Sequence, residues 1–131
     1  MDLDGLKQLN DTYGHELGDA AVVETAKAIL DSTDICDVVG RLGGDEFLVV
    51  LCDTHSADGD AVAERVNESL ARHSLSANDL VVPLRASVGV ALAHCDADTD
   101  PMTLVREADA AMYRAKRTAR IARDPAAGVL T

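Results

Sequence analysis

Aromatic side chains are scarce in this sequence, and long apolar runs are absent. Phe47, Tyr13 and Tyr113 are the only aromatic residues among 131, so the core has to be built from Val, Leu, Ala and Ile. Apolar residues make up 47% of the chain, which is enough to bury a core in one domain. No run approaches a membrane span, and no charged-then-apolar leader is present. We therefore expect a soluble, cytoplasmic domain without a membrane segment.

Cysteine and basic residues are also in short supply. Cys36, Cys52 and Cys95 are odd in number and form no CxxC pair, which argues against a zinc site or a disulfide framework. Cys52 ends a strand-like run and is interpreted as a small apolar residue. Lys and Arg number 12 against 23 Asp and Glu, for a net charge of -11. Such a surface repels nucleic acid, but it is compatible with one nucleotide held through a metal ion.

The sequence does contain an ordered series of apolar patterns. Six segments carry one, with helices at 19–31, 60–72 and 100–120 and strands at 38–42, 47–52 and 84–93. Asp100 followed by Pro101 is typical of a helix start. With one strand in front, the order of these segments is the βαββαβ order of ferredoxin-like sheets. We therefore predict an α+β fold with a central antiparallel sheet flanked by helices.

The first strand of that order is almost missing. The chain opens on MDLD, which resembles the end of a strand, and in this fold the first strand is central. Its loss would leave two strands without a hydrogen-bonding partner. We expect a domain over residues 1–122 with a truncated first strand, a loose tail over 123–131, and a sequence that is a piece of a longer chain.

Two pairs of acidic residues mark the candidate site. Asp2 and Asp4 end the truncated strand, and Asp45 and Glu46 follow two glycines in RLGGDEF, residues 41–47, between the strands of a predicted hairpin. Adjacent glycines supply the positive φ that a tight turn needs. The first strand runs beside this hairpin in a βαββαβ sheet, so the two pairs could meet and hold Mg²⁺ with a substrate phosphate. The alternative is that these acids form a solvated turn.

Residues 4–19, DGLKQLNDTYGHELGD, form a polar, turn-rich segment before the first predicted helix. Its backbone amides could bind phosphate, and Asn10 with Asp19 could recognise a guanine edge. The alternative is ordinary turn chemistry, with Asp19 as the N-cap of the helix that follows. His15 is interpreted as holding local structure rather than as a general base.

Lys116 and Arg120 lie four residues apart on the last predicted helix, so they share one of its faces. Two aligned cations suit the oxygens of a triphosphate. The alternative is a solvated basic face near a helix C-terminus, where positive charge is favoured.

Taken together, four motifs in order resemble the GGDEF family, the diguanylate cyclase domain, from Asp2 to about Arg120. They are DLDGLKQLNDTYGHELGD (2–19), RLGGDEF (41–47), ASVGVA (86–91) and ADAAMYRAK (108–116). The resemblance implies a nucleotidyl-cyclase-like fold and a Mg²⁺- or Mn²⁺-dependent enzyme that condenses two GTP into cyclic di-GMP and releases pyrophosphate. Each domain of a homodimer would hold one GTP, and the 3′-hydroxyl of each would attack the α-phosphate of the other.

The resemblance also implies a role for each motif residue. The metal ligands would be the carboxylates of Asp2 and Asp45, the Leu3 carbonyl, and Glu46, which could instead help deprotonate the hydroxyl. Asn10 and Asp19 would recognise guanine. Groups that would hold the β- and γ-phosphates are Lys116, Arg120 and the backbone amides of residues 5–7, which include Leu6 and Lys7. In the catalytic turn, Gly43 and Gly44 would let the α-phosphate of the other substrate approach closely.

The sequence departs from the family at three places. Many members carry an inhibitory product site, RxxD, but here the window is Asp34-Ile35-Cys36-Asp37. An acid replaces the arginine, and we expect no product inhibition through it. Leu6 stands where Phe is usual. The glycine and asparagine that usually flank Arg120 are Ala119 and Ile121.

Three hypotheses about function follow from the resemblance. The first is a diguanylate cyclase domain, active as a homodimer, with a sensory or dimerising module N-terminal to it in the parent protein. The second is a domain that binds GTP without catalysis and regulates a partner, such as a phosphodiesterase domain of the EAL type. The third is an inactive fragment.

Overall fold

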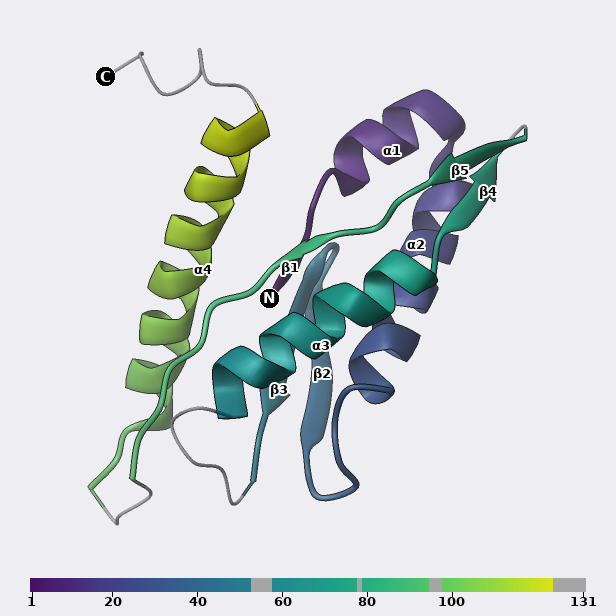
Figure 1. Cartoon of the computed structure of the whole chain (residues 1–131). Helices are drawn as coiled ribbons and strands as arrows, with labels where there is room; N and C mark the ends of the chain where they lie inside the picture. Colours follow the sequence, from purple (N-terminus) through teal and green to yellow (C-terminus); the bar gives the residue numbers. More distant parts are fainter. Residues whose placement is uncertain (53–57, 78, 95–97, 124–131) are drawn as a thin grey trace. The chain divides into compact units, whose positions relative to one another are not determined.

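The computed structural model describes residues 1–52, 58–77, 79–94 and 98–123. Figure 1 shows its helices and strands. The chain divides into two compact units, Met1–Ala86 and Ser87–Thr131, and each is described by itself. No helix among the described residues is both long enough and apolar enough to cross a bilayer.

The main sheet has the strand order β2-β3-β1-β6. Its strands are β1 (Asp2–Leu3), β2 (Val38–Gly43), β3 (Glu46–Val50) and β6 (Ala86–Ser87). Both β1 and β2 pair antiparallel with β3, so the first strand is central even though it contains only two residues. The prediction of an α+β, ferredoxin-like antiparallel sheet is confirmed.

Hydrogen bonds on both sides fix this short central strand. The amide of Leu3 donates to the carbonyl of Asp45 at 2.8 Å, and the amide of Phe47 donates to the carbonyl of Met1 at 2.9 Å. On the other side, the amide of Asp4 donates to the carbonyl of Arg85 at 2.8 Å. Because its backbone groups are paired and Leu3 is 1% exposed, β1 is anchored to the hairpin.

The segment before the first predicted helix is itself helical. It forms α1 (Leu6–Tyr13), and α2 (His15–Leu30) begins earlier than predicted. Gly5 and Gly14, with φ of 78° and 89°, form the turns that begin the two helices, and such angles favour glycine. The prediction of a turn-rich loop over residues 4–19 is therefore wrong. The alternative of Asp19 as an N-cap is wrong too, because Asp19 lies inside α2.

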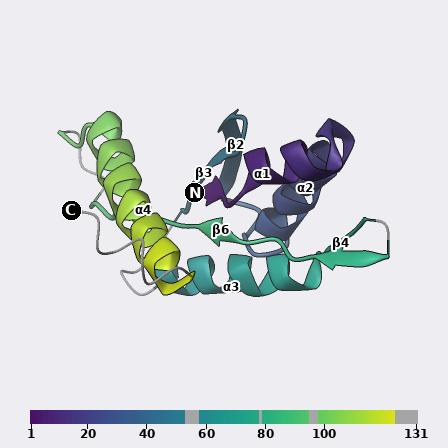
Figure 2. The ribbon, with the colours of Figure 1, turned by 90° about the horizontal axis from the view of Figure 1, so that it is seen from above.

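The core of the first unit lies between the hairpin and two helices. Figures 1 and 2 show α3 (Asp58–Arg72) on one side of β2 and β3. Buried apolar side chains come from β3, α2 and α3: Phe47, Ala21, Val22, Ala28, Ile29, Val66 and Leu70. The helical spacing over 60–72 predicted the buried face of α3, which includes Val66 and Leu70.

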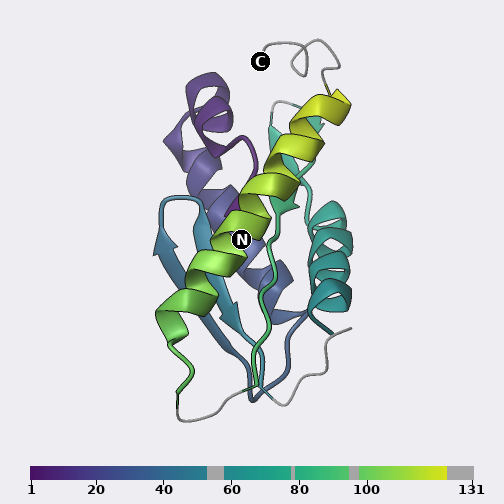
Figure 3. The same cartoon turned by 90° about the vertical axis from the view of Figure 1, so that its left-hand side faces the viewer.

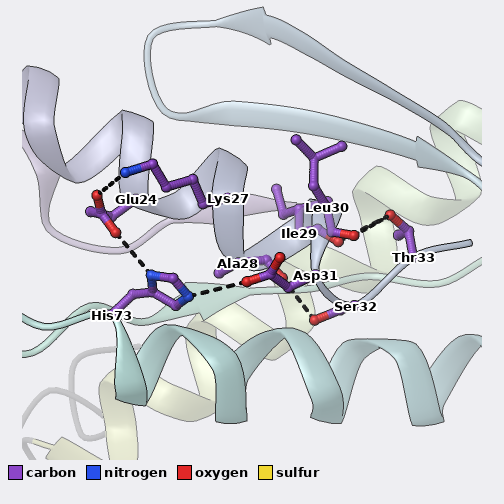
Figure 4. A network of polar contacts seen from close by, with 9 residues as sticks. All are labelled: Glu24, Lys27, Ala28, Ile29, Leu30, Asp31, Ser32, Thr33 and His73. Carbon is purple, nitrogen blue, oxygen red and sulfur yellow. Dashed lines mark hydrogen bonds and ion pairs between the residues drawn. The ribbon is translucent and has the colours of Figure 1, made fainter.

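Polar contacts also join α2 to the C-terminal end of α3 (Figure 4). Glu24 accepts from Lys27 Nζ at 2.7 Å, and its other oxygen lies 2.8 Å from His73 Nδ1. His73 Nε2 lies 3.4 Å from the Asp31 carboxylate. The imidazole, one residue beyond the end of α3, therefore bridges Glu24 on α2 and the C-cap residue of that helix, Asp31.

A second, two-stranded sheet was not predicted. It pairs β4 (Leu75–Ala77) with β5 (Leu80–Val82). Asp79, at the turn, has φ of 65°, an angle that aspartate tolerates better than most residues. The Asn-Asp step between two short runs was the sequence signal for this hairpin.

The second unit contains the long helix α4 (Pro101–Arg123) (Figure 3). Asp100 caps it as predicted, since its carboxylate accepts from the amide of Met102 at 3.1 Å. The predicted strand over 84–93 is wrong except at Ala86–Ser87, because β1 offers only two residues to pair with. The backbone at Gly89 packs directly against the backbone of α4, where a Cβ would overlap Ala108 and Met112. The predicted loose tail lies outside the described residues from 124 onward.

Candidate functional site

One acid of each predicted pair meets the other in the sheet, whereas the amide of Asp4 bonds to the carbonyl of Arg85. Asp2 on β1 is the direct register partner of Glu46 on β3. Paired residues of antiparallel strands project to the same face with Cβ atoms about 5 Å apart. Asp45 precedes Glu46 in the turn, and its carbonyl holds the amide of Leu3 at 2.8 Å. Asp2 is 7% exposed whereas Glu46 is exposed, so the pair runs from the interior to the surface.

This donor set fits a divalent cation that also binds a phosphate. Among the described residues, no three His, Cys, Asp or Glu side chains are gathered closely enough to hold a metal ion. Mg²⁺ usually takes only one or two carboxylates, keeps several waters and draws its other ligands from substrate phosphates. The Asp2–Glu46 pair fits this mode of binding and does not fit an all-protein metal cage.

The hairpin is confirmed, but the reason for its glycines differs from the one expected. Gly43 and Gly44 are not in the positive-φ region, which among the described glycines holds only Gly5 and Gly14. A register shift between Arg41 and Gly43 closes the turn instead. A Cβ at Gly43 or Gly44 would meet no protein atom within 4 Å. The fold therefore leaves open space at both positions.

Arg41 fastens this turn, a role that the sequence analysis missed. Its Nε and one terminal nitrogen donate to the carbonyl of Gly44 at 3.2 and 2.8 Å. The guanidinium thereby fixes the peptide between Gly44 and Asp45. The position of Arg41 three residues before Gly44 in RLGGDEF was the available signal, but such a contact depends on the turn geometry and not on composition.

The start of α1 is an uncapped helix terminus close in sequence to the acids. No side chain caps it at Gly5, so the amides of its first turn, at Leu6 and Lys7, have no intrahelical partner. Such amides attract phosphate. Leu6 is half-buried and Lys7 is exposed.

Asn10 and Gly18 bring α1 and α2 into direct contact. A Cβ on Gly18 would overlap the Asn10 amide, so a larger residue there would displace this side chain from its present position. The Oδ1 atom of Asn10 is buried without a hydrogen-bond partner, which is true of no other side-chain atom in the part of the chain described. Asp19 is exposed and follows Gly18 directly in the chain, and its part in guanine recognition stays a prediction. The sequence analysis did not predict this close contact at Gly18, although the glycine of GHELGD, residues 14–19, was the feature that could have indicated it.

Lys116 and Arg120 lie in the second unit, on one continuous helix. Both are exposed on α4, and their spacing puts them on one face as predicted. His15, the remaining polar residue considered, is the exposed first residue of α2.

The window where the family carries its inhibitory site is internally hydrogen-bonded. Asp37 accepts from the amide of Asp34 at 2.8 Å through one carboxylate oxygen and from the amide of Cys52 at 3.0 Å through the other. These two backbone hydrogen bonds lower the pKa of Asp37 below its ordinary value. Both oxygens of the Asp37 carboxylate therefore already accept backbone hydrogen bonds, one from Asp34 and one from Cys52.

Known proteins resemble the chain across almost its whole length. The profile of the family described as "Diguanylate cyclase, GGDEF domain" matches residues 1–121. Diguanylate cyclase A of Treponema denticola is 36% identical over 120 residues, which are 92% of this chain and 32% of that protein. The bifunctional diguanylate cyclase/cyclic di-GMP phosphodiesterase MucR of Pseudomonas aeruginosa is 39% identical over 121 residues, 92% of this chain and 17% of that protein.

Solved structures agree with the sequence matches. The crystal structure of the GGDEF domain of TpbB from Pseudomonas aeruginosa superposes with a TM-score of 0.79 at 38% identity, covering 89% of this chain and 73% of that one. The chain spans about a third or less of the curated relatives named above. The family profile, the relatives and the sheet that pairs Asp2 with Glu46 agree, and the chain belongs to the GGDEF family.

Proposed function

We propose that this chain is the catalytic domain of a diguanylate cyclase, which joins two GTP molecules into cyclic di-GMP and releases two pyrophosphates. The observation that carries the proposal is the register pair of Asp2 and Glu46, fixed by the hydrogen bond from Leu3 to Asp45. Two carboxylates held on one face of a sheet repel each other unless a cation joins them. Their placement is explained by a function that needs a cation.

Asp2, Asp45 and Glu46, with the Leu3 carbonyl, would hold Mg²⁺ or Mn²⁺. When bound, such an ion neutralises phosphate charge and orients the reacting phosphoryl group. The protein's own contribution is positional: β1 and the turn clamped by Arg41 keep the acids in place. Glu46, the exposed member of the pair, could instead accept the proton of an attacking 3′-hydroxyl.

The remaining residues would bind the rest of GTP. The amides of Leu6 and Lys7 at the uncapped start of α1 suit the terminal phosphates, and Lys116 with Arg120 would add positive charge. Asn10 and Asp19 would recognise guanine, because the unpartnered Asn10 oxygen can accept from a base N–H group. Open space at Gly43 and Gly44 would admit the α-phosphate of a second substrate.

Cyclic di-GMP is symmetric, and this chain offers one guanine-recognition pair, so catalysis would need two copies facing each other. The part of the relatives that this chain does not cover leaves room for a sensory or dimerising module in the parent protein. A domain that uses GTP would act in the cytoplasm, which is the localisation we propose.

The first test is to incubate the purified chain with GTP and Mg²⁺ and to separate the products by chromatography. A second sample should extend the N-terminus by a complete first strand and a dimeric coiled coil, which supplies the facing copy. Cyclic di-GMP that disappears in Glu46→Gln would support the proposal. GTP binding without product, in a folded and dimeric sample, would favour a regulatory module instead.

A further inference from the structure

Two thiols lie together at the open end of the β2–β3 hairpin. The paired residues of this hairpin include Val38 with Val50 and Val39 with Val49, and continuing that register by two positions places Cys36 opposite Cys52. Both cysteines lie just beyond the paired strands, Cys36 in a turn and Cys52 in a bend. The Cys52 thiol donates to the carbonyl of Cys36 at 2.9 Å, which places its sulfur against the backbone of Cys36.

Asp37 holds the two chain segments at this distance. Its carboxylate accepts from the amide of Cys52 at 3.0 Å, and the same oxygen lies 4.0 Å from the Cys36 sulfur. The contact joins residues that are 15 apart in sequence, so it ties the loop before β2 to the segment after β3. The thiols are therefore kept together by a hydrogen bond that does not involve either sulfur as its donor.

Both side chains are exposed, so the sulfur of Cys52, interpreted from the sequence as a small apolar residue, is accessible. A metal site is not supported either, because the described residues hold no group of three ligating side chains and both Asp37 oxygens already accept backbone hydrogen bonds. Cys36 and Cys52 are therefore two exposed thiols on neighbouring chain segments.

We propose that Cys36 and Cys52 form a reversible intramolecular disulfide by exchange with a small-molecule disulfide such as oxidised glutathione. The bond would close the base of the hairpin whose tip carries Gly43, Gly44, Asp45 and Glu46. It would thus place a redox-sensitive covalent link across the element that carries the proposed catalytic turn. The inference rests on the geometry of the thiols and is independent of the proposed cyclase activity.

The exchange takes place in two steps. The Cys52 thiolate attacks one sulfur of the reagent, forms a mixed disulfide and releases one thiolate, which takes up a proton. The Cys36 thiolate then attacks the Cys52 sulfur and releases the second thiolate. Two protein thiols are oxidised while one reagent disulfide is reduced to two thiols. Partial desolvation and the Asp37 carboxylate raise the pKa of the Cys36 thiol, which lowers the fraction of this thiol present as the nucleophilic thiolate.

The sequence makes the product easy to map. Trypsin cleaves after Lys27, Arg41 and Arg65, so Cys36 lies in the peptide 28–41 and Cys52 in the peptide 42–65, each as its sole cysteine. The reduced chain is incubated with oxidised glutathione, quenched with acid, blocked with a maleimide and digested. Mass spectrometry then detects the two peptides either joined or separately alkylated. The same incubation in urea gives the yield for the unfolded chain.

We expect the joined peptides 28–41 and 42–65 to become the main form of both cysteines in the folded chain, with loss of both maleimide adducts. Reducing agent should restore the adducts. In the matched variants Cys36→Ser and Cys52→Ser, the remaining thiol should carry only a glutathione adduct. The proposal is overturned if the folded chain gives only mixed adducts, if Cys95 takes the place of either partner, or if the urea-unfolded chain yields as much of the joined product.

Discussion

Asp2 and Glu46 face each other across β1 and β3, so two acids occupy one cross-strand pair. Like charges directly opposite each other destabilise a sheet. The chain tolerates the pair because three backbone hydrogen bonds, at Leu3, Phe47 and Asp4, hold β1 in register. We propose that cation binding at this pair offsets the repulsion.

The first prediction concerns this repulsion. Glu46→Gln should raise the free energy of unfolding in metal-free buffer by about 0.2–1 kcal/mol, because it removes one of two like charges. The same change should lower GTP turnover by at least ~100-fold, since a carboxylate needed for metal binding or proton transfer is lost. Urea denaturation and product chromatography measure the two effects.

Its control is Glu68→Gln, which neutralises an exposed acid on α3 and should change neither quantity appreciably. Added Mg²⁺ with GTP should raise the thermal midpoint of the unmodified chain, and a chelator should reverse the rise. A rise of equal size in Glu46→Gln would contradict the assignment of Glu46 to the metal.

The second prediction uses the open space at the hairpin tip. Gly44→Ala should leave the free energy of unfolding within about 0.5 kcal/mol, because the new Cβ meets no protein atom and the residue is not at positive φ. Turnover should fall by roughly 100-fold if the substrate phosphate passes close to this backbone. Gly40→Ala is the matched control, because Gly40 also has no atom within 4 Å of its Cβ position and lies away from the tip. Equal activity in both variants would show that Gly44 has no role in substrate approach.

The third prediction separates packing from recognition at the α1–α2 contact. Asn10→Ala removes an oxygen that has no partner within the protein, so the free energy of unfolding should change by less than about 1 kcal/mol, while GTP affinity falls by roughly 10- to 100-fold. Gly18→Ala should instead cost about 1–3 kcal/mol of stability, because its Cβ would overlap Asn10. Calorimetric titration with GTP and with ATP measures recognition. Unchanged GTP affinity in Asn10→Ala would remove Asn10 from the binding site.

The fourth prediction concerns product binding. The Asp37 carboxylate is occupied by the amides of Asp34 and Cys52, and Asp34 itself adds a negative charge. We therefore expect no cyclic di-GMP binding that maps to residues 34–37, as measured by titration calorimetry with amide chemical-shift mapping. Asp34→Arg should increase affinity for cyclic di-GMP, because a guanidinium pairs with phosphate. Tight binding of the product at this window in the unmodified chain would refute the prediction.

The fifth prediction is a pH dependence of stability. The Lys27 hydrogen bond, followed by that from His73, lowers the pKa of Glu24 below 4.5. A carboxyl with a lowered pKa in the folded state contributes stability above its unfolded pKa and loses it as the pH falls through the folded value. The stability difference between the unmodified chain and Glu24→Gln should therefore shrink on acidification from about pH 6 to roughly pH 3. Urea unfolding at several pH values tests this, and a constant difference would be contrary to it.

Much of the fold followed from periodicity alone. The spacing of Val62, Val66 and Leu70 predicted α3, and Asp100 with Pro101 predicted the start of α4. Both signals depend only on residues close together in the sequence, so they predict the helices without knowledge of the tertiary contacts. The motif residues Asp2 and Glu46 were expected to meet because the strand order of the fold requires it.

The failures have physical causes too. The segment that became α1 is rich in Asn, Asp and Thr, whose side chains compete with helical hydrogen bonds, and tertiary contact with α2 through Gly18 overrode that tendency. The strand over 84–93 depended on a partner, and β1 is too short to provide one. Contacts such as Arg41 with Gly44, or Cys52 with Asp37, depend on the geometry of turns. Composition and residue spacing therefore do not predict them.

The brevity of β1 has one more consequence. Successive residues of a strand project to opposite faces, so a shift of β1 by one residue would turn the Asp2 carboxylate to the other side of the sheet. The hydrogen bonds of Leu3, Phe47 and Asp4 select the alignment in which Asp2 is the register partner of Glu46. These three backbone contacts therefore determine the face on which the Asp2 carboxylate lies.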